Sequence, residues 1–154
     1  MTDQSEILLL RDGEEPPWPL LLDADPSREL VERYLAKGET YVLNWDRKII
    51  GVIVLYPLGG TAWEIKNIAV AEGYQGQGFG KKLLAFAIQT ARAKGAKTLR
   101  IGTGNSSFDQ LALYQKAGFR IIGIDRGFFT RHPYEPMEEN GIAVTDMVML
   151  EMAL

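Results

Sequence analysis

The chain has 154 residues, 46% of them hydrophobic, and a net charge of −3, values typical of one globular domain that we expect to span residues 1–154. This charge balance provides no basic surface for nucleic acid or an anionic membrane, and we expect neither as a partner. Cysteine is absent and His132 is the one histidine, so a disulfide framework, a thiol nucleophile and a metal site are not expected.

An acidic segment opens the chain and contains a short apolar run from Ile7 to Leu10. Because this segment resembles neither a signal peptide nor a membrane span, a cytoplasmic location is expected. Residues 5–10 predict a first strand, which the proline-rich EEPPWP segment interrupts because proline removes a ladder donor. Asp25 and Pro26 are then typical of the N-cap and first position of a helix.

Glycine turns and hydrophobic periodicity divide the rest of the chain into further elements. The first helix is expected to end near Gly38, and Ser107 and Gln110 have the spacing of a capping box at the start of the last helix. A long irregular loop, of a kind that is usually functional or mobile, separates the last two strands. The predicted elements are a hairpin over residues 40–57, strands over residues 61–70, 97–104, 119–125 and 145–154, helices over residues 78–94 and 107–117, and the loop over residues 126–144.

Three glycines on alternate positions, Gly76, Gly78 and Gly80, lie at the start of the helix predicted over residues 78–94. A helix N-terminus presents unpaired N–H groups and the positive end of the helix dipole, so a loop without side chains there favours an anion such as phosphate. The spacing fits neither a P-loop, which requires a hydroxyl residue after the lysine, nor the dinucleotide fingerprint G-x-G-x-x-G. The alternative is a loop whose glycines serve only a turn.

The strand over residues 61–70 changes its alternation partway along. Its bulky apolar side chains occupy odd positions as far as Ile65 and even positions from Ile68 onwards. Such a slip predicts a β-bulge near Lys66 and Asn67, which would end pairing with the next strand and open a gap. The alternative is a strand that is buried on both faces.

The segment Gln75–Gly80 matches the motif Q/R-x-x-G-x-G/A; it follows the strand WEIKNIAV and precedes the segment NSSFDQLALYQKAGF. Together with the order of elements, these segments resemble the GNAT superfamily of acetyl-CoA-dependent N-acetyltransferases over nearly the whole chain. The resemblance implies an α/β, single-domain GNAT fold with a mixed, mostly antiparallel central sheet of about seven strands. It also implies helices on both faces and a split between strands 4 and 5, which agrees with the predicted bulge.

The resemblance further implies that acetyl-CoA is the co-substrate and that no metal is required. Backbone amides of the glycine loop would hold the pyrophosphate, and the preceding strand would pair with the pantetheine arm. The residues implied are Gln75, Gly76, Gln77, Gly78, Phe79, Gly80 and Lys81 for the pyrophosphate, Ile68, Ala69 and Val70 for the arm, and Asn105 for a hydrogen bond to it. For Asn105, a helix-capping role is the alternative.

Amine acetylation needs a base for the amine, a donor to the oxyanion and an acid for the departing thiolate. The resemblance assigns these roles to Glu64, acting directly or through water, to the Ile68 N–H, and to Tyr114. A phenol, with an ordinary pKa of about 10, remains protonated at neutral pH and can supply that proton. The alternatives are an exposed strand carboxylate for Glu64 and plain core packing for Tyr114.

The expected reaction moves an acetyl group from acetyl-CoA to a primary amine of a small molecule or peptide by direct attack in a ternary complex. A non-catalytic acyl-CoA-binding sensor and a structural protein whose glycine loop is only a turn are the two alternatives. The late loop suits a cationic amine with an apolar part, although a solvated acidic loop is equally consistent with its residues, Phe128, Phe129, Tyr134, Glu135, Glu138 and Glu139. The final strand allows pairing with a second subunit, and hence a homodimer.

Overall fold

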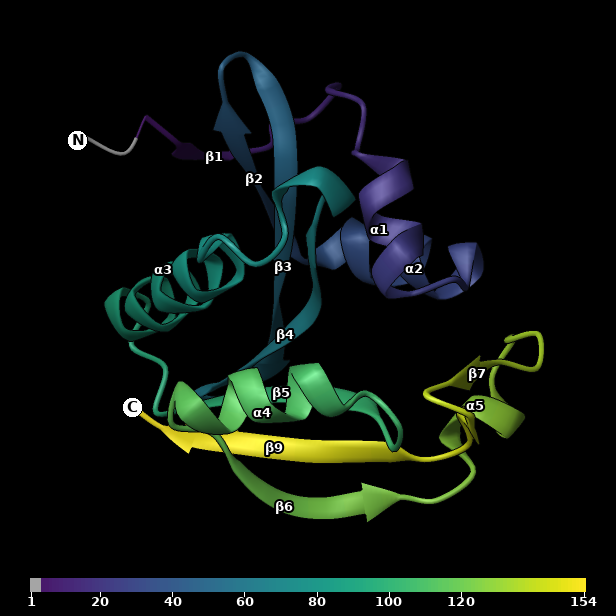
Figure 1. The fold of residues 1–154 in the computed structure, drawn as a ribbon. Coiled ribbons are helices and arrows are strands. Elements are labelled where there is room, and N and C mark those ends of the chain that lie inside the picture. The colour runs from purple at the N-terminus through teal and green to yellow at the C-terminus, as the bar shows by residue number, and fades with distance from the viewer. Residues whose placement is uncertain (1–3) are drawn as a thin grey trace.

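Seven strands form one mixed sheet in the computed structural model, which describes residues 4–154 (Figure 1). Their order across the sheet is β1-β2-β3-β4-β5-β9-β6; β4 and β5 are parallel, and the other neighbouring pairs are antiparallel. The strands are β1 (Glu6–Leu9), β2 (Glu39–Trp45), β3 (Lys48–Gly59), β4 (Ala62–Val70), β5 (Thr98–Gly104), β6 (Arg120–Asp125) and β9 (Met147–Ala153). The predicted fold class is confirmed.

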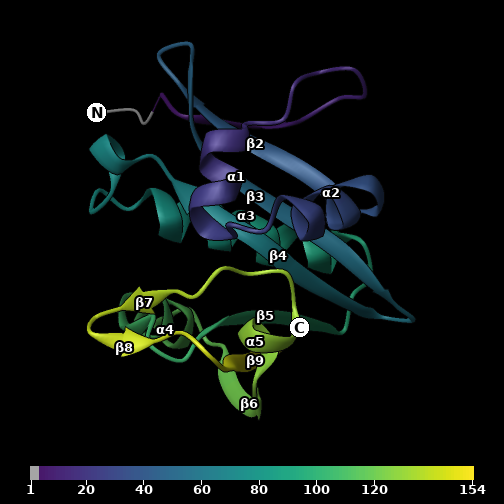
Figure 2. The same cartoon turned by 90° about the vertical axis from the view of Figure 1, so that its right-hand side faces the viewer.

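Helices cover both faces of this sheet, as expected (Figures 1 and 2). The helices α1 (Trp18–Ala24) and α2 (Arg28–Lys37) lie on one face of β3 and β4, and α3 (Phe79–Ala93) lies on the other. Helix α4 (Phe108–Lys116) packs beside β6, and the short helix α5 (Phe128–Arg131) follows β6. Over residues 4–154, no helix combines the length and the apolar character needed to cross a bilayer.

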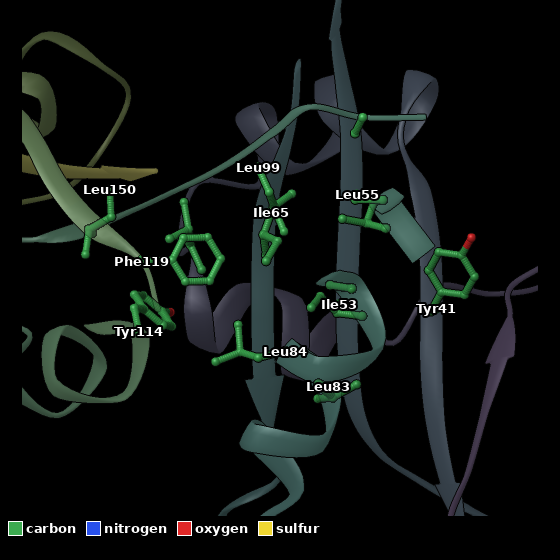
Figure 3. Packing of buried hydrophobic residues seen from close by; sticks show 14 of the residues in the cluster. Tyr41, Ile53, Leu55, Ile65, Leu83, Leu84, Leu99, Tyr114, Phe119 and Leu150 are labelled. Atoms are coloured by element: carbon green, nitrogen blue, oxygen red, sulfur yellow. The ribbon is translucent and has the colours of Figure 1, made fainter. Parts of the chain in front are cut away.

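The central strand β3 is buried on both faces because its alternate side chains enter two different clusters. Ile53 and Leu55 pack in the cluster that includes Leu83 of α3 (Figure 3). Val52 and Val54 point to the opposite face and join the cluster formed by α1 and α2. Each fully buried aliphatic side chain stabilises the fold by about 1.5–3 kcal/mol. These two clusters hold α1 and α2 on one side of β4 and α3 on the other.

The helices differ from the sequence prediction in three ways: one helix was not predicted, and two helix starts are capped differently. The sequence pattern does not predict α1, although Pro19 is its second residue, where the missing N–H of proline costs nothing. The predicted N-cap at Asp25 is wrong: α2 begins after Ser27, whose Oγ accepts a hydrogen bond from the Leu30 N–H at 3.3 Å. Asp25 is the C-cap residue of α1. The predicted capping box of α4 is also wrong, because the Ser107 side chain makes no capping hydrogen bond.

The late loop is more regular than the sequence suggests. Besides α5, it contains the hairpin of β7 (Glu138–Glu139) and β8 (Ile142–Ala143), so the prediction of an irregular loop over residues 126–144 is wrong in these segments. Asn140 and Gly141 turn the hairpin with φ of 55° and 74°. This is the left-handed pair that a type I′ turn requires, and an Asn-Gly dipeptide is its usual signal.

Strand β4 carries the predicted bulge. Asn67 pairs with Val54 of β3 and Ile65 pairs with Leu55, so Lys66 is the extra residue between them. Pairing of β4 with β5 ends at Ile65, immediately before the bulge. Both the bulge near Lys66 and the split between the fourth and fifth strands are therefore confirmed.

Candidate active site

A cavity of about 750 Å³ lies where β4 and β5 separate. Figure 2 shows α1 above and the β7–β8 hairpin below this region. The wall combines the second half of β4, the glycine loop, the end of β5, helix α4, the α1–α2 connection and the late loop. Its residues are 23–26, 65–70, 74–76, 78–81, 101–104, 107, 109, 110, 113, 114, 129, 134, 137–139, 144 and 147.

Most of the predicted site residues line this cavity. Those that do are Ile68, Ala69, Val70, Gln75, Gly76, Gly78, Phe79, Gly80, Lys81 and Tyr114. Glu64, Gln77 and Asn105 are not part of its wall. The Asn105 side chain instead holds the main chain of residues 143–146, accepting from two N–H groups and donating to one carbonyl at 2.9–3.1 Å. Its contact with the pantetheine arm stays a prediction.

The glycine loop presents bare backbone to the cavity. Gly76 and Gly78 have φ of 76° and 90°, a left-handed conformation that favours glycine, and a Cβ added at either would meet nothing within 4 Å. The first hydrogen bond of α3 is donated by the Lys82 N–H to Gly78 O at 3.0 Å. The N–H groups of residues 76–81 donate to no acceptor in the described part of the chain. They lie at the positive end of the α3 dipole. Such a loop can hold a phosphate through its backbone.

Backbone groups of β4 also face the gap. The Ala71 N–H donates to Ile50 O at 2.8 Å, and hydrogen bonding to the neighbouring strand alternates along an antiparallel pair. The N–H and C=O groups of Ile68 and Val70 therefore point away from β3, toward the side where β5 has separated. Gln75 agrees with this orientation, since its Nε2 donates to Val70 O at 2.9 Å.

The bulge puts two polar side chains of β4 on the same face, although they are three positions apart in the sequence. Glu64 lies opposite Tyr56 of β3, and Asn67 lies opposite Val54 of β3. Tyr56 and Val54 both lie on the face of the sheet that α1 and α2 cover, so Glu64 and Asn67 lie on that face too. The Glu64 carboxylate is buried, and its Oε1 lies 2.9 Å from the Lys66 ammonium. Lys66 lines the cavity and Glu64 does not, so this ion pair joins the Glu64 carboxylate to a residue of the wall.

A second polar cluster on this face links α2, β4, the α1–α2 connection and the late loop. Asp25 Oδ1 accepts from Tyr134 OH at 2.8 Å and from the Ser27 N–H at 3.3 Å, and Oδ2 accepts from Tyr34 OH at 3.1 Å. Asn67 Nδ2 donates to Tyr34 OH at 2.9 Å. In the described residues, no group of three or more side chains could hold a metal ion.

Burial changes the acidity of this cluster. Loss of solvation raises the pKa of Asp25, although hydrogen bonds from Tyr134, Ser27 and Tyr34 and the charge of Lys66 oppose the shift. Burial, and after it the negative charge of Asp25, raises the pKa of Tyr34 and of Tyr134 well above the usual range. Both phenols are therefore protonated at neutral pH, as hydrogen-bond donors to Asp25 must be.

Tyr114 of α4 belongs both to the core and to the cavity wall (Figure 3). Its ring packs edge-on against Phe119, with the ring centroids 6.4 Å apart. Burial raises the pKa of the Tyr114 phenol, so the phenol stays protonated at neutral pH. Core packing and a role as an acid are thus compatible in one residue, and the acid role stays a prediction.

Sequence reasoning missed Asp25, Tyr34 and Asn67 as site residues. An asparagine at the position of the alternation slip was an available signal for Asn67. Asp25 resembles a helix cap because Pro26 follows it, and Tyr34 belongs to the apolar stripe of a helix. The late loop does reach the cavity through Phe129, Tyr134, Met137, Glu138 and Glu139. Phe128 and Glu135, which the sequence also suggested, are not part of its wall.

Comparisons with known proteins point to one family. Residues 7–119 match the profile of the Acetyltransferase (GNAT) family. The chain is 50% identical over 137 residues to the uncharacterized N-acetyltransferase YvbK of Bacillus subtilis (strain 168). This match covers 89% of the present chain and 88% of YvbK. The structure of the present chain is similar to that of a GNAT family acetyltransferase from Elizabethkingia anophelis with acetyl-CoA bound, with a TM-score of 0.97, 50% identity, and coverage of 99% and 100% of the two chains. It is also similar to a Bacillus subtilis acetyltransferase in complex with CoA, with a TM-score of 0.91, 47% identity, and coverage of 97% and 99%.

Proposed function

Since this chain belongs to the Acetyltransferase (GNAT) family and is an acetyl-CoA-dependent N-acetyltransferase, we propose that it acetylates a primary amine of a small molecule or peptide by direct attack in a ternary complex. The observation that carries this proposal is the cavity at the split. There the backbone groups of Ile68 and Val70 and the unpaired amides of the glycine loop face one space.

The residues present fit acetyl-CoA, which supplies an activated acetyl thioester when bound. The pyrophosphate would lie on the bare backbone of the glycine loop, because unpaired N–H groups at a helix N-terminus favour negative charge. The open edge of β4 would pair with the pantetheine arm as a strand would. The residues proposed for these contacts are Gln75, Gly76, Gln77, Gly78, Phe79, Gly80 and Lys81 for the pyrophosphate, and Ile68, Ala69, Val70 and Asn105 for the arm.

Three groups of the chain would carry the chemistry. Glu64 takes the proton of the acceptor ammonium through water, because its carboxylate contacts Lys66 and lies outside the cavity wall. The Ile68 N–H donates a hydrogen bond to the thioester oxygen as negative charge develops on it. As the C–N bond forms and the C–S bond breaks, Tyr114 donates its phenol proton to the departing sulfur. The second amine proton is lost to solvent, a solvent proton restores the phenol, and Glu64 releases its proton to solvent, so the cycle sets free one proton. No covalent acyl-enzyme is required.

Further parts of the proposal concern the whole protein. The chain acts as one domain over residues 1–154, in the cytoplasm and without a metal. Its acceptor is an amine and not nucleic acid or a membrane, in keeping with the net charge of −3. A homodimer remains a prediction.

Calorimetric titration tests the donor site. The purified chain is titrated with acetyl-CoA, coenzyme A and 3′-dephospho-coenzyme A, with ATP and NAD as controls. We expect only the coenzyme A series to bind, in the range of about 1 μM, which corresponds to roughly −8 kcal/mol. No binding to any of the three would overturn the assignment of the glycine loop.

A thiol-release screen tests the reaction. Turnover with at least one primary amine is the expected result. Binding of acetyl-CoA without turnover of any amine would instead favour the non-catalytic acyl-CoA-binding module.

A further inference from the structure

An unpaired amide oxygen points to a ligand site beside the split. Asn67 lines the cavity, is 4% exposed, and its Oδ1 has no hydrogen-bond partner in the described part of the chain. The orientation of this amide is determined, because Nδ2 donates to Leu21 O at 2.9 Å and a carbonyl can only accept. A buried acceptor without a donor costs free energy, so a ligand with an N–H group would supply the hydrogen bond that Asn67 Oδ1 lacks.

The neighbouring side chains also offer acceptors. Tyr34 and Tyr134 direct their protons at Asp25. The Tyr34 oxygen already accepts from Asn67 Nδ2, whereas the Tyr134 oxygen accepts from no donor among the described residues and keeps its lone pairs for a ligand. Asp25 Oδ1 already receives two hydrogen bonds, whereas Oδ2 receives one, from Tyr34, and keeps a lone pair for another donor. Asp25, Asn67 and Tyr134 all belong to the cavity wall, and together they hold acceptor oxygens with unused lone pairs and one negative charge there.

The charge of the wall agrees with this chemistry. Asp23 lines the cavity from the last turn of α1, Asp25 from the α1–α2 connection, and Glu138 and Glu139 from β7. On the same face, the ammonium of Lys66 is already paired with a carboxylate. An acidic wall with acceptor oxygens attracts a cation and disfavours a ligand that carries its own carboxylate at the same point.

We propose that Asp25, Asn67 and Tyr134 form the recognition site for the ammonium group of the acceptor, with Tyr34 as a positioning residue. This inference rests on the proposed function and identifies the acceptor class as a protonated primary amine without a neighbouring carboxylate. An ammonium group has three N–H donors, which match Asp25 Oδ2, Asn67 Oδ1 and the Tyr134 oxygen. Asn67 directly precedes Ile68, whose N–H faces the gap, so an ammonium bound here lies beside the carbonyl to be attacked.

The two substrates would then enter from opposite faces of β4. The glycine loop leads into α3, which packs on one face, whereas Asp25 and Asn67 lie on the face covered by α1 and α2. The split beyond Ile65 joins the two faces, because no strand fills the space next to β4 there. This arrangement places the amine and the acyl group on opposite sides of one opening.

Binding to the non-reactive coenzyme A complex tests the inference. The chain saturated with coenzyme A is titrated with 2-phenylethylamine, spermidine, kanamycin and an alanyl tetrapeptide, in the wild type and in the Asp25→Asn variant. Asparagine has the same shape: its oxygen can still accept from Tyr134, and its NH2 group can donate to the Tyr34 oxygen in place of accepting from it. Thermal unfolding verifies that the variant is folded. Glu32→Gln, which removes an exposed carboxylate on α2, is the matched control for the change in net charge.

We expect at least one amine to bind the wild type and Glu32→Gln equally. Asp25→Asn should weaken its binding by on the order of 30-fold or more. In turnover, Asp25→Asn should raise the KM for the amine by a similar factor with little change in the Kd for acetyl-CoA, and Asp25→Glu should restore part of the loss. If no amine binds the wild type, or if Asp25→Asn binds amines normally, the inference is overturned. If amines bind in a way that depends on Asp25 but none is acetylated, the proposed reaction is refuted and the ammonium site stands. If Asp25→Asn acetylates amines as the wild type does, the ammonium site is refuted and the proposed reaction stands.

Discussion

Replacing Gly78 by alanine separates the two roles of the glycine loop, as a turn and as a phosphate site. Gly78 is the N-cap residue of α3, with φ of 90°, and an added Cβ would meet no atom of the chain within 4 Å. The variant therefore has room to fold. Its Cβ would nevertheless project from the backbone whose N–H groups we assign to the pyrophosphate.

The expected magnitudes follow from this geometry. An L-residue in the left-handed conformation costs about 1–2 kcal/mol. For a chain of this size, that lowers the Tm by roughly 2–8 °C. A hydrogen bond to a charged group contributes about 1.5–3 kcal/mol, so losing one amide–phosphate contact should weaken coenzyme A binding roughly 10- to 150-fold.

Gly95→Ala is the matched control. Gly95 has φ of 81°, has no atom within 4 Å of an added Cβ, and lies just after the other end of α3. Both variants should show a similar fall in Tm by calorimetry, because both force alanine into the same backbone conformation. Titration with coenzyme A should then give the wild-type Kd for Gly95→Ala and a weaker one for Gly78→Ala. Equal, wild-type Kd values for the two variants would refute the phosphate assignment.

Three further predictions concern the polar residues. Tyr114→Phe should lower kcat by roughly 10²- to 10⁴-fold while leaving the Kd for acetyl-CoA nearly unchanged; a wild-type rate in a thiol-release assay where chemistry limits would remove Tyr114 as the acid. Glu64→Gln should suppress the rise of kcat/KM toward basic pH, because the proton acceptor for the amine is lost, and a wild-type pH profile would reject the base role. Asp25→Asn should change the pH dependence of stability. Burial raises the folded-state pKa of Asp25, so the folded protein binds this proton more tightly than the unfolded chain does. Wild-type stability should therefore fall relative to Asp25→Asn as the pH rises from about 3.9 through the folded-state pKa. Thermal melts of both proteins at several pH values measure this difference, and a wild-type stability that stays level or rises relative to that of Asp25→Asn over this pH range contradicts the argument.

The Asp25 prediction connects stability with function. A carboxylate that is partly desolvated and incompletely compensated destabilises the fold at neutral pH. Proteins retain such groups where a ligand later supplies the missing partner, and removing them often raises stability at the expense of activity. Higher stability together with weaker amine binding in Asp25→Asn would identify this carboxylate as a group kept for its ligand.

Local sequence patterns determined much of this protein. Alternation and turn residues predicted the seven strands, and Asp46 and Arg47 form the expected hairpin turn, with φ of 51° and 64°. The slip in alternation located the bulge at Lys66 correctly, because a side-chain period of two makes any extra residue visible in the sequence. The alternate glycines similarly predicted a bare backbone before α3.

The tertiary structure alone decided which polar side chains meet. Asp25 and Tyr134 are 109 positions apart, and their hydrogen bond depends on how the late loop packs under the α1–α2 connection. Asn67 joins them because the bulge and the packing of α1 and α2 determine which face of β4 it occupies. Periodicity over neighbouring residues carries no information about such contacts, which arise when sheet and helices bury their apolar faces against one another. The donor site was therefore predictable from a contiguous motif, whereas the acceptor site had to be found in the folded chain.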